Sequence, residues 1–412
     1  MRRILVISDH GDPLAGLGGI QSGGQNVYVR ELALALDKLG WLVDIFTHWS
    51  ETEKPQVEKL GSKGRIIRLG AGHRGFVPKD QMVSLVPTFT AELLEWVSQN
   101  KVSYQLIHSN YWLSGWIAEK LAKRWGIPWV HVSHSLGMVK ATYSNSPVAE
   151  TRIRKERQIL HRADSVIATS PQEKGILCKS YSVPATKVKV IPCGVDPLKF
   201  FPREQEKDRT ALGWKKQEKI VLFVGRPEPA KGLEVLMRAL NHLSKKTVFR
   251  QKLVLVIIGG HTEEAREMGK KLGVEYAIRL LGPVPHEKIP VYYGAADVCV
   301  VPSFYESFGL VAIEAMACGC PVVASAVGGL QFTVRNGLTG LLVNPGQPQD
   351  LARALEIVLT DPTLRLNLAR QAARWVAHHF TWPQVAKRIS TLYQELLQWK
   401  NAQRESFLHS SF

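Results

Sequence analysis

The segment Arg3-Ile4-Leu5-Val6-Ile7-Ser8 decides the fold class of this chain. Its short apolar run, closed by turn residues, is typical of a strand buried on both faces of a parallel sheet. A glycine-rich loop follows, with Gly16, Gly18, Gly19, Gly23 and Gly24. Residues 25–39 then show the apolar spacing of a helix, which Gly40 ends. A strand, a glycine loop and a helix in this order predict the first unit of a doubly wound α/β sheet.

The alternation of strands and helices continues outward from this unit. It pauses at residues 191–202, which are rich in turn formers, and at the charged stretch 203–219. That change of composition predicts a domain boundary. Strands are expected again at 220–225, 253–258, 298–301, 322–324 and 341–343. The pattern is typical of two Rossmann-like doubly wound α/β domains that face each other across a cleft.

The expected domains are residues 1–195, 196–375 and a C-terminal helical part at 376–412. The third part is predicted to pack back on the first domain, with its polar tail after Asn401 disordered. The helices from residue 349 onward are expected to break at Pro362 and Pro383.

The composition of the chain favours some classes of partner and excludes some types of site. The 412 residues include 53 Lys and Arg against 36 Asp and Glu, a net charge of +17. Such a surplus favours anionic partners: nucleic acid, acidic lipid or phosphorylated small molecules. The five cysteines form no C-x-x-C pair, which excludes a zinc ribbon and a thioredoxin-type site. The N-terminal apolar run is too short for a signal peptide, and glycines and prolines break the longest charge-free stretch. We therefore expect a cytoplasmic protein without stable membrane insertion.

The glycine loop after the first strand is expected to cradle a phosphate or a sugar. Glycine lets backbone N–H groups approach a ligand at a helix N-terminus, although a purely structural turn is the alternative. Residues 16–21 fail the dinucleotide pattern G-x-G-x-x-G at its last place, and the second strand ends in Thr47-His48 rather than an acid. No Walker A loop occurs in the chain. Hydride transfer on NAD and P-loop hydrolysis are therefore disfavoured.

Two acids and two cations mark the second domain. Glu306 falls in an expected strand–helix loop, and Glu314 falls on a helix predicted at 310–318 among apolar neighbours. A buried carboxylate needs a hydrogen-bond partner, for which a ribose diol is suitable; a solvated helix face is the alternative. Arg226 and Lys231 flank a loop at a strand end, where they can neutralise a departing diphosphate. Either cation alone would be interpreted as a solvated surface group.

Together these residues resemble the retaining GT-B glycosyltransferases with an E-x7-E motif. The resemblance implies a GT-B fold and a hexosyl transfer in which Glu306 contacts the donor sugar and Glu314 the nucleotide ribose. The implied catalytic residues are His134, Arg226, Lys231 and Glu306. The implied donor-binding residues are Gly24, Arg226, Lys231, Phe308, Gly309, Leu310 and Glu314.

The first domain is similar to the sucrose-phosphate synthases in three elements. They are His10-Gly11-Asp12-Pro13-Leu14, residues 23–32, and His134-Ser135-Leu136-Gly137 followed by Lys140. The implied acceptor-binding residues are Gln25, Lys79, Tyr111, Ser135, Lys140, Arg152 and Arg154. Cations and a hydroxyl are what a phosphate dianion needs. Related mycothiol-pathway transferases typically carry Met at the place of Gln25, and Val139 departs from the polar residue usual before Lys140.

The resemblance implies glucosyl transfer from UDP-glucose or ADP-glucose to fructose 6-phosphate, with a separate sucrose-phosphate phosphatase as a partner. Sucrose synthase and a peripheral-membrane lipid glycosyltransferase are the alternatives within the group. The second would place a helix at 112–125 on acidic lipid. A nucleic-acid binder is disfavoured, because no helix-turn-helix, zinc-finger or RNP-type motif supports it.

We predict that the donor nucleotide binds without a metal and that no cofactor is required, although Mg²⁺ can still stimulate turnover. No D-x-D motif follows an expected strand, and Arg226 with Lys231 can replace the ion. Calorimetric titration of UDP in excess EDTA should therefore give an affinity close to that in Mg²⁺. Complete loss of UDP binding in the chelator would contradict the prediction.

Overall fold

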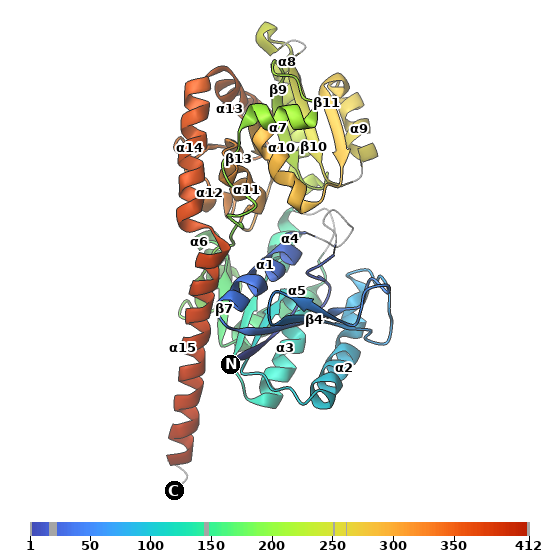
Figure 1. The fold of residues 1–412 in the computed structure, drawn as a ribbon, viewed down its shortest axis with the longest axis vertical. Coiled ribbons are helices and arrows are strands. Elements are labelled where there is room, and N and C mark those ends of the chain that lie inside the picture. Colours follow the sequence, from blue (N-terminus) through green and yellow to red (C-terminus); the bar gives the residue numbers. More distant parts are fainter. Residues whose placement is uncertain (1, 16–22, 144–147, 250–251, 261, 410–412) are drawn as a thin grey trace.

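The computed structural model describes residues 2–15, 23–143, 148–249, 252–260 and 262–409. Within these residues the chain forms two sheets, each with helices on both faces, in the lower and upper halves of Figure 1. The expected pair of Rossmann-like α/β units is confirmed. The predicted glycines at 16, 18 and 19 lie outside the described residues.

The first sheet has the order β3-β4-β2-β1-β5-β6-β7-β8. Its strands are β1 (Arg3–Ile7), β2 (Leu42–His48), β3 (Val57–Leu60), β4 (Gly64–Leu69), β5 (Leu106–Asn110), β6 (Trp129–Val132), β7 (Ser165–Ala168) and β8 (Val188–Val190). Its helices are α1 (Gly24–Lys38), α2 (Val86–Gln99), α3 (Tyr111–Trp125), α4 (Gly137–Tyr143), α5 (Glu150–Arg162) and α6 (Pro171–Ser180). Neighbouring strands run parallel except β3, which is antiparallel to β4. The sequence pattern does not predict β3, β4 or β8, because β3 and β8 are short and β4 carries two arginines.

The second sheet has the order β11-β10-β9-β12-β13-β14, with all neighbours parallel. Its strands are β9 (Lys219–Val224), β10 (Leu253–Ile258), β11 (Ile278–Gly282), β12 (Val298–Val301), β13 (Val322–Ser325) and β14 (Leu341–Val343). Its helices are α7 (Gln205–Leu212), α8 (Leu233–Ser244), α9 (Thr262–Lys271), α10 (Ile289–Ala295), α11 (Leu310–Ala317), α12 (Leu330–Thr333) and α13 (Pro348–Thr360). Helix α7 forms inside the charged stretch that the sequence presents as a boundary, and β11 is not predicted.

Strand β1 illustrates why apolar runs form the centres of both sheets. Ile4 and Val6 pack into the cluster under α1, whereas Leu5 and Ile7 pack into the cluster under α2 and α3. All four side chains are buried, because successive residues of a strand point to opposite faces and both faces carry helices.

Each sheet has one point at which its strand order reverses. Strand β1 lies between β2 and β5, and β9 lies between β10 and β12. Ligands of open α/β sheets bind outside the carboxyl ends of the strands at such a point. The loops after β1 and β5, and those after β9 and β12, are therefore where this fold can hold ligands.

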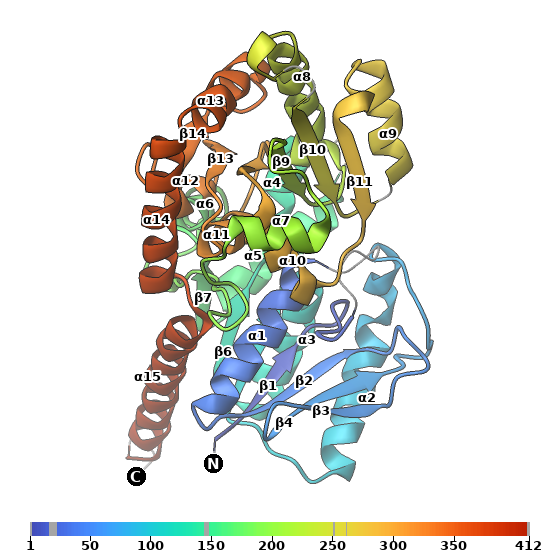
Figure 2. The same cartoon turned by 45° about the horizontal axis from the view of Figure 1, so that its top comes forward.

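Two segments cross between the domains and pair with each other. The Val195 N–H donates to the Phe380 carbonyl at 2.9 Å, and the Trp382 N–H donates to the Val195 carbonyl at 3.1 Å. Helix α14 (Pro362–His379) lies beside the second sheet, whereas α15 (Trp382–His409) runs along the first (Figures 1 and 2). The expected division at 375/376 falls inside α14, since the chain crosses only after it.

The C-terminal tail is helical, and its expected disorder after Asn401 is wrong, because α15 continues to His409. The helix is anchored on the first domain, where the Trp41 indole N–H donates to the Ser390 hydroxyl at 2.9 Å. Extending a helix that is already nucleated needs far less free energy than starting one, so the polar residues beyond the anchored part remain helical.

Gly194 permits the close approach of the two crossing segments. A Cβ atom there would lie 2.6 Å from the Trp382 nitrogen and 2.7 Å from the Thr381 carbonyl carbon. Gly194→Ala should therefore force these backbones apart, at a cost of about 1–3 kcal/mol, and lower the melting temperature. The control is Gly175→Ala in α6, where a Cβ meets no atom within 4 Å and which should not lower it. Equal melting temperatures for Gly194→Ala and the wild type would contradict this account.

Candidate active site

The carboxyl ends of the two sheets meet at the junction of the domains. Gly24 begins α1, and a Cβ atom on it would lie 3.1 Å from Leu310 Cδ1 at the start of α11. The Ser170 hydroxyl, after β7, donates to the Ser307 carbonyl at 3.1 Å. The Tyr143 and Tyr305 rings stack at a centroid distance of 5.6 Å. Two helix N-termini, each with N–H groups that lack helical partners, therefore lie close together, as an anionic ligand requires.

The second domain contributes an acid and two cations to this junction. Lys231 Nζ donates to Glu306 Oε2 at 2.7 Å, which joins the loop after β9 to the loop after β12. Arg226, after β9, lies 3.0 Å from the Glu228 carboxylate, and both side chains are about half exposed. Lys231 and Glu306, which the sequence assigns to separate loops, are thus in direct contact in the structure.

The start of α11 depends on Gly309. Its φ is 95°, and a Cβ atom there would lie 2.6 Å from Leu330 Cδ2. Phe308, expected at the donor site, is buried and packs its ring on Phe380 at 5.6 Å. Its side chain therefore belongs to the core, and only its backbone lies in the loop that begins α11.

Glu314 is buried on α11, as the apolar neighbours of the motif predict. Its Oε1 lies 2.7 Å from His286 Nε2, and its Oε2 accepts from the Tyr293 hydroxyl at 3.1 Å. Neither partner is found from the sequence, because His286 and Tyr293 stand in no motif. The solvated helix face that was the alternative for Glu314 is wrong.

Tyr111 organises the side expected to bind the acceptor. It follows β5 in a left-handed conformation, with φ 77°, at the switch point of the first sheet. Lys79 Nζ lies 4.2 Å and Arg152 Cζ 5.1 Å from the centroid of its ring. Desolvation of the ammonium group is the main cause that lowers the pKa of Lys79 to about 8; Arg152, Lys140 and Arg226 lower it further, and Asp9 opposes them. Positive charges from both domains thus repel one another at this point, and a bound anion would offset that repulsion.

The R-x-R pair diverges in the structure. Arg152 is buried, donates to the Ser135 carbonyl at 3.2 Å and pairs with Glu156 at 2.8 Å. Arg154 is exposed, since two residues along a helix correspond to a turn of about 200°. The structure therefore brings Arg152, but not Arg154, to Tyr111. Lys140 on α4 is exposed as well.

Gln25 and His134 lie on the first-domain side of the junction. Gln25 Nε2 donates to the Ser8 hydroxyl at 3.2 Å. His134 has φ 55°, and its Nε2 lies 2.9 Å from Asn110 Oδ1. The Asn110 amide donates to the Ile7 carbonyl at 3.3 Å, so its oxygen faces the ring and His134 Nε2–H must be the donor. Burial lowers the pKa of His134 well below its usual range, which keeps the ring neutral with Nδ1 free of a proton.

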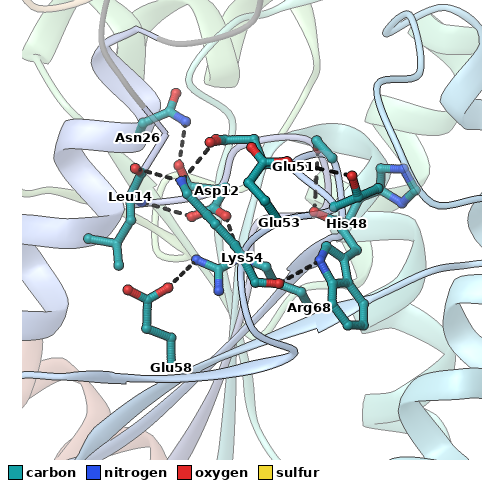
Figure 3. Close-up of polar contacts among 12 residues, drawn as sticks. Asp12, Leu14, Asn26, His48, Glu51, Glu53, Lys54, Glu58 and Arg68 are labelled. Atoms are coloured by element: carbon teal, nitrogen blue, oxygen red, sulfur yellow. Dashed lines mark hydrogen bonds and ion pairs between the residues drawn. The ribbon is translucent and has the colours of Figure 1, made fainter.

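The described residues that follow β1 are held by a network that the sequence does not predict (Figure 3). Arg68 on β4 is fully buried and donates to Asp12 Oδ2 at 2.7 Å. The Asp12 carbonyl accepts from the Asn26 amide at 2.8 Å, and Lys54 donates to the Leu14 carbonyl at 2.9 Å. Asp12 lies in a quoted motif, but no local signal links it to an arginine 56 residues away.

Two features of the described residues bear on the wider alternatives. Among the described residues, no group of three His, Cys, Asp or Glu side chains could hold a metal ion. None of the helices in the same part of the chain has an apolar stretch that could span a bilayer. Helix α3, the candidate for a lipid surface, buries Trp112, Leu113 and Ile117 in the core.

Comparison with known proteins identifies the family. Residues 22–198 match Glycosyltransferase Family 4, and residues 204–375 match Glycosyl transferases group 1. A D-inositol 3-phosphate glycosyltransferase of Corynebacterium jeikeium is 37% identical over 407 residues, which cover 96% of this chain and 97% of that protein. The chain belongs to the group 1 glycosyltransferases. Enzymes of this group with the GT-B fold are retaining, so the predicted activity class is confirmed.

Solved structures agree with the fold of this glycosyltransferase. The sucrose-phosphate synthase of Thermosynechococcus elongatus is 39% identical, with a TM-score of 0.90 over 97% of this chain and 100% of that one. The Anabaena HepE protein, in complex with UDP and glucose, is 22% identical with a TM-score of 0.76 over 96% of this chain and 100% of that one. The second likeness shows the fold alone. The expected GT-B fold is confirmed.

The pKa of Lys79 predicts a pH dependence for this glycosyltransferase. Only the protonated ammonium attracts a phosphate, and in the free enzyme it is lost as the pH rises through about 8. Because kcat/KM reports the free enzyme, kcat/KM for a phosphorylated acceptor should fall through this range. Lys79→Arg keeps its charge and should remove the fall, whereas the exposed control Lys270→Arg should keep it. An unchanged fall in Lys79→Arg would assign the titration to another group.

Proposed function

We propose that this enzyme transfers glucose, with retention, from a nucleotide-glucose to fructose 6-phosphate, forming sucrose 6-phosphate. The observation that carries the proposal is the pair of cations, Lys79 and Arg152, on the ring of Tyr111 at the switch point of the first sheet. A lysine with a depressed pKa beside a second cation is unfavourable without an anion, and an acceptor phosphate supplies it.

The donor occupies the other side of the junction in this proposal. The facing N-termini of α1 and α11 hold the diphosphate together with Arg226 and Lys231, and Glu314 holds the ribose. UDP-glucose is the preferred donor and ADP-glucose the alternative. HepE, which shares the fold, is described in complex with UDP-glucose.

The transfer exchanges one bond at the anomeric carbon of glucose. The bond to the diphosphate oxygen breaks, the acceptor hydroxyl oxygen forms the new bond on the same face, and its proton passes to the departing diphosphate. Lys231 and Arg226 neutralise the charge that develops on that group. Glu306, paired with Lys231 at 2.7 Å, orients this cation and is not a covalent nucleophile.

D-inositol 3-phosphate is the second candidate acceptor. It is favoured by the names of relatives that are 34–38% identical across nearly the whole chain. It would use the same phosphate site, so Lys79 and Arg152 do not separate the two. Gln25 supports the ketose: it stands where mycothiol-pathway transferases typically carry Met, and its Ser8-held amide can bond to sugar hydroxyls.

The proposal predicts discrimination between acceptors. With UDP-glucose as donor, kcat/KM for fructose 6-phosphate should exceed that for fructose about a hundredfold or more, since charged contacts to phosphate are worth a few kcal/mol. Arg152→Ala should lose most of this preference, whereas Arg154→Ala, on the other face of α5, should keep it.

Two outcomes would contradict the proposal. Equal use of fructose and fructose 6-phosphate would leave a sucrose-synthase-like or unspecified transferase. A higher kcat/KM for D-inositol 3-phosphate than for fructose 6-phosphate, measured with UDP-glucose and with ADP-glucose, would establish the second candidate. A preference for phosphate that survives Arg152→Ala would reject only the role of that residue.

A further inference from the structure

His286 stands outside the sequence motifs and contacts the carboxylate proposed to bind the ribose. It lies on a short helical turn, His286–Lys288, just before α10. Its Nε2 is 2.7 Å from Glu314 Oε1, and the side chains of both residues are only 9% exposed. Tyr293 holds the other oxygen of Glu314 at 3.1 Å. The carboxylate is therefore fixed from two sides before any ligand is bound.

The second nitrogen of His286 faces the other domain. Arg30 on α1 places Nη2 3.5 Å from His286 Nδ1. Arg30 pairs with Glu31 at 3.0 Å, and Glu31 pairs with Lys199, in the segment that crosses between the domains, at 3.1 Å. A polar chain thus runs from Glu314 through His286 to α1, the helix whose first turn carries Gly24 and Gln25.

The direction of these hydrogen bonds depends on the protonation of His286. Arginine has only donors, so the bond from Arg30 requires a bare Nδ1 and leaves Nε2–H to donate to Glu314. A proton on Nδ1 would face the guanidinium and remove this contact between the domains. Neutral His286 therefore joins the domains, whereas charged His286 pairs with Glu314 alone.

The surroundings of His286 decide where it titrates. Burial lowers its pKa, but the Glu314 carboxylate outweighs burial, so the net shift is upward; Arg30 lowers the pKa and Glu31 raises it. The other groups that face the ring are the Tyr293 hydroxyl, through Glu314, and the Phe200 ring at 5.1 Å. The two forms of His286 therefore exchange at a higher pH than they would in a free imidazole.

We propose that His286 is a positioning residue that orients Glu314 for the donor ribose and couples it to α1 through Arg30. The inference rests on the proposed donor-binding role of Glu314. Each carboxylate oxygen has two lone pairs, so after bonding to His286 and Tyr293 each retains one for a ribose hydroxyl. Loss of the Arg30 contact at low pH would separate this prepared carboxylate from the helix that helps to hold the diphosphate.

The test is calorimetric binding of UDP to the full-length protein between pH 5.5 and 8.5. His286→Ala should weaken binding about tenfold, the equivalent of one lost hydrogen bond in a buried site. His286→Gln keeps an N–H donor and should bind within about threefold of the wild type at high pH. The advantage of the wild type over His286→Gln should disappear as the pH falls through the pKa of His286. UDP itself also changes its protonation with pH. The readout is therefore the ratio of the wild-type and variant affinities at each pH, to which the titration of UDP contributes equally.

Arg30→Gln distinguishes positioning from a merely structural role. Without the guanidinium there is no Arg30 contact for protonation of His286 to remove, so the pH dependence of UDP binding that distinguishes the wild type from His286→Gln should be lost. The matched control, His242→Gln, removes an exposed histidine of α8 in the same domain and should change neither the affinity nor its pH dependence. Circular dichroism identifies any variant that fails to fold. If His286→Ala fails to fold, Arg30→Gln and His286→Gln still test the inference.

Glu314→Ala distinguishes the proposed role of Glu314 from its coupling to α1 through His286. If it binds UDP as the wild type does, the proposed role of Glu314 and the inference both fail. If it loses affinity while His286→Gln and Arg30→Gln share the wild-type pH profile, Glu314 keeps its role and the coupling through His286 is overturned.

Discussion

Parallel pairing of strands is the constraint on which the rest of this molecule depends. In a parallel sheet every strand ends at the same edge, so the loops that follow β1, β5, β9 and β12 collect at two edges only. The paired crossing segments at Val195 and Phe380 turn these edges toward each other. Helix α15 then fixes the arrangement, because it belongs to the second half of the chain but packs on the first domain.

Charge at the junction follows from this geometry. Cations from both domains lie within electrostatic reach of one another, as the influence of Arg226 on Lys79 shows. Such a site is unfavourable when empty and favourable when it holds the two phosphorylated substrates proposed here. The two acids have different partners. Glu306 pairs with Lys231, whereas the buried Glu314 accepts hydrogen bonds from His286 and Tyr293. One motif therefore yields two carboxylates with different environments.

Much of the fold and part of the site could be predicted because their signals are local. Apolar runs between turn residues predicted most of the parallel strands, and Glu314 among apolar neighbours predicted a buried carboxylate. Strands β3 and β8 could not be predicted, since short edge strands bury few side chains. The R-x-R pair shows the limit: the sequence places Arg152 and Arg154 together, but helical rotation directs only Arg152 to Tyr111.

The sequence by itself determined the order of most central strands and their helices, the positions of glycines, and the types of charged residue beside them. Each of these depends on neighbours in the chain. Only the tertiary structure decided that His286 lies between Glu314 and Arg30, which are 28 and 256 residues away from it. It also decided that Arg68 holds Asp12. The physical reason is that hydrogen bonds and ion pairs form over a few ångströms, and the packing of two separate sheets sets which distant side chains come that close.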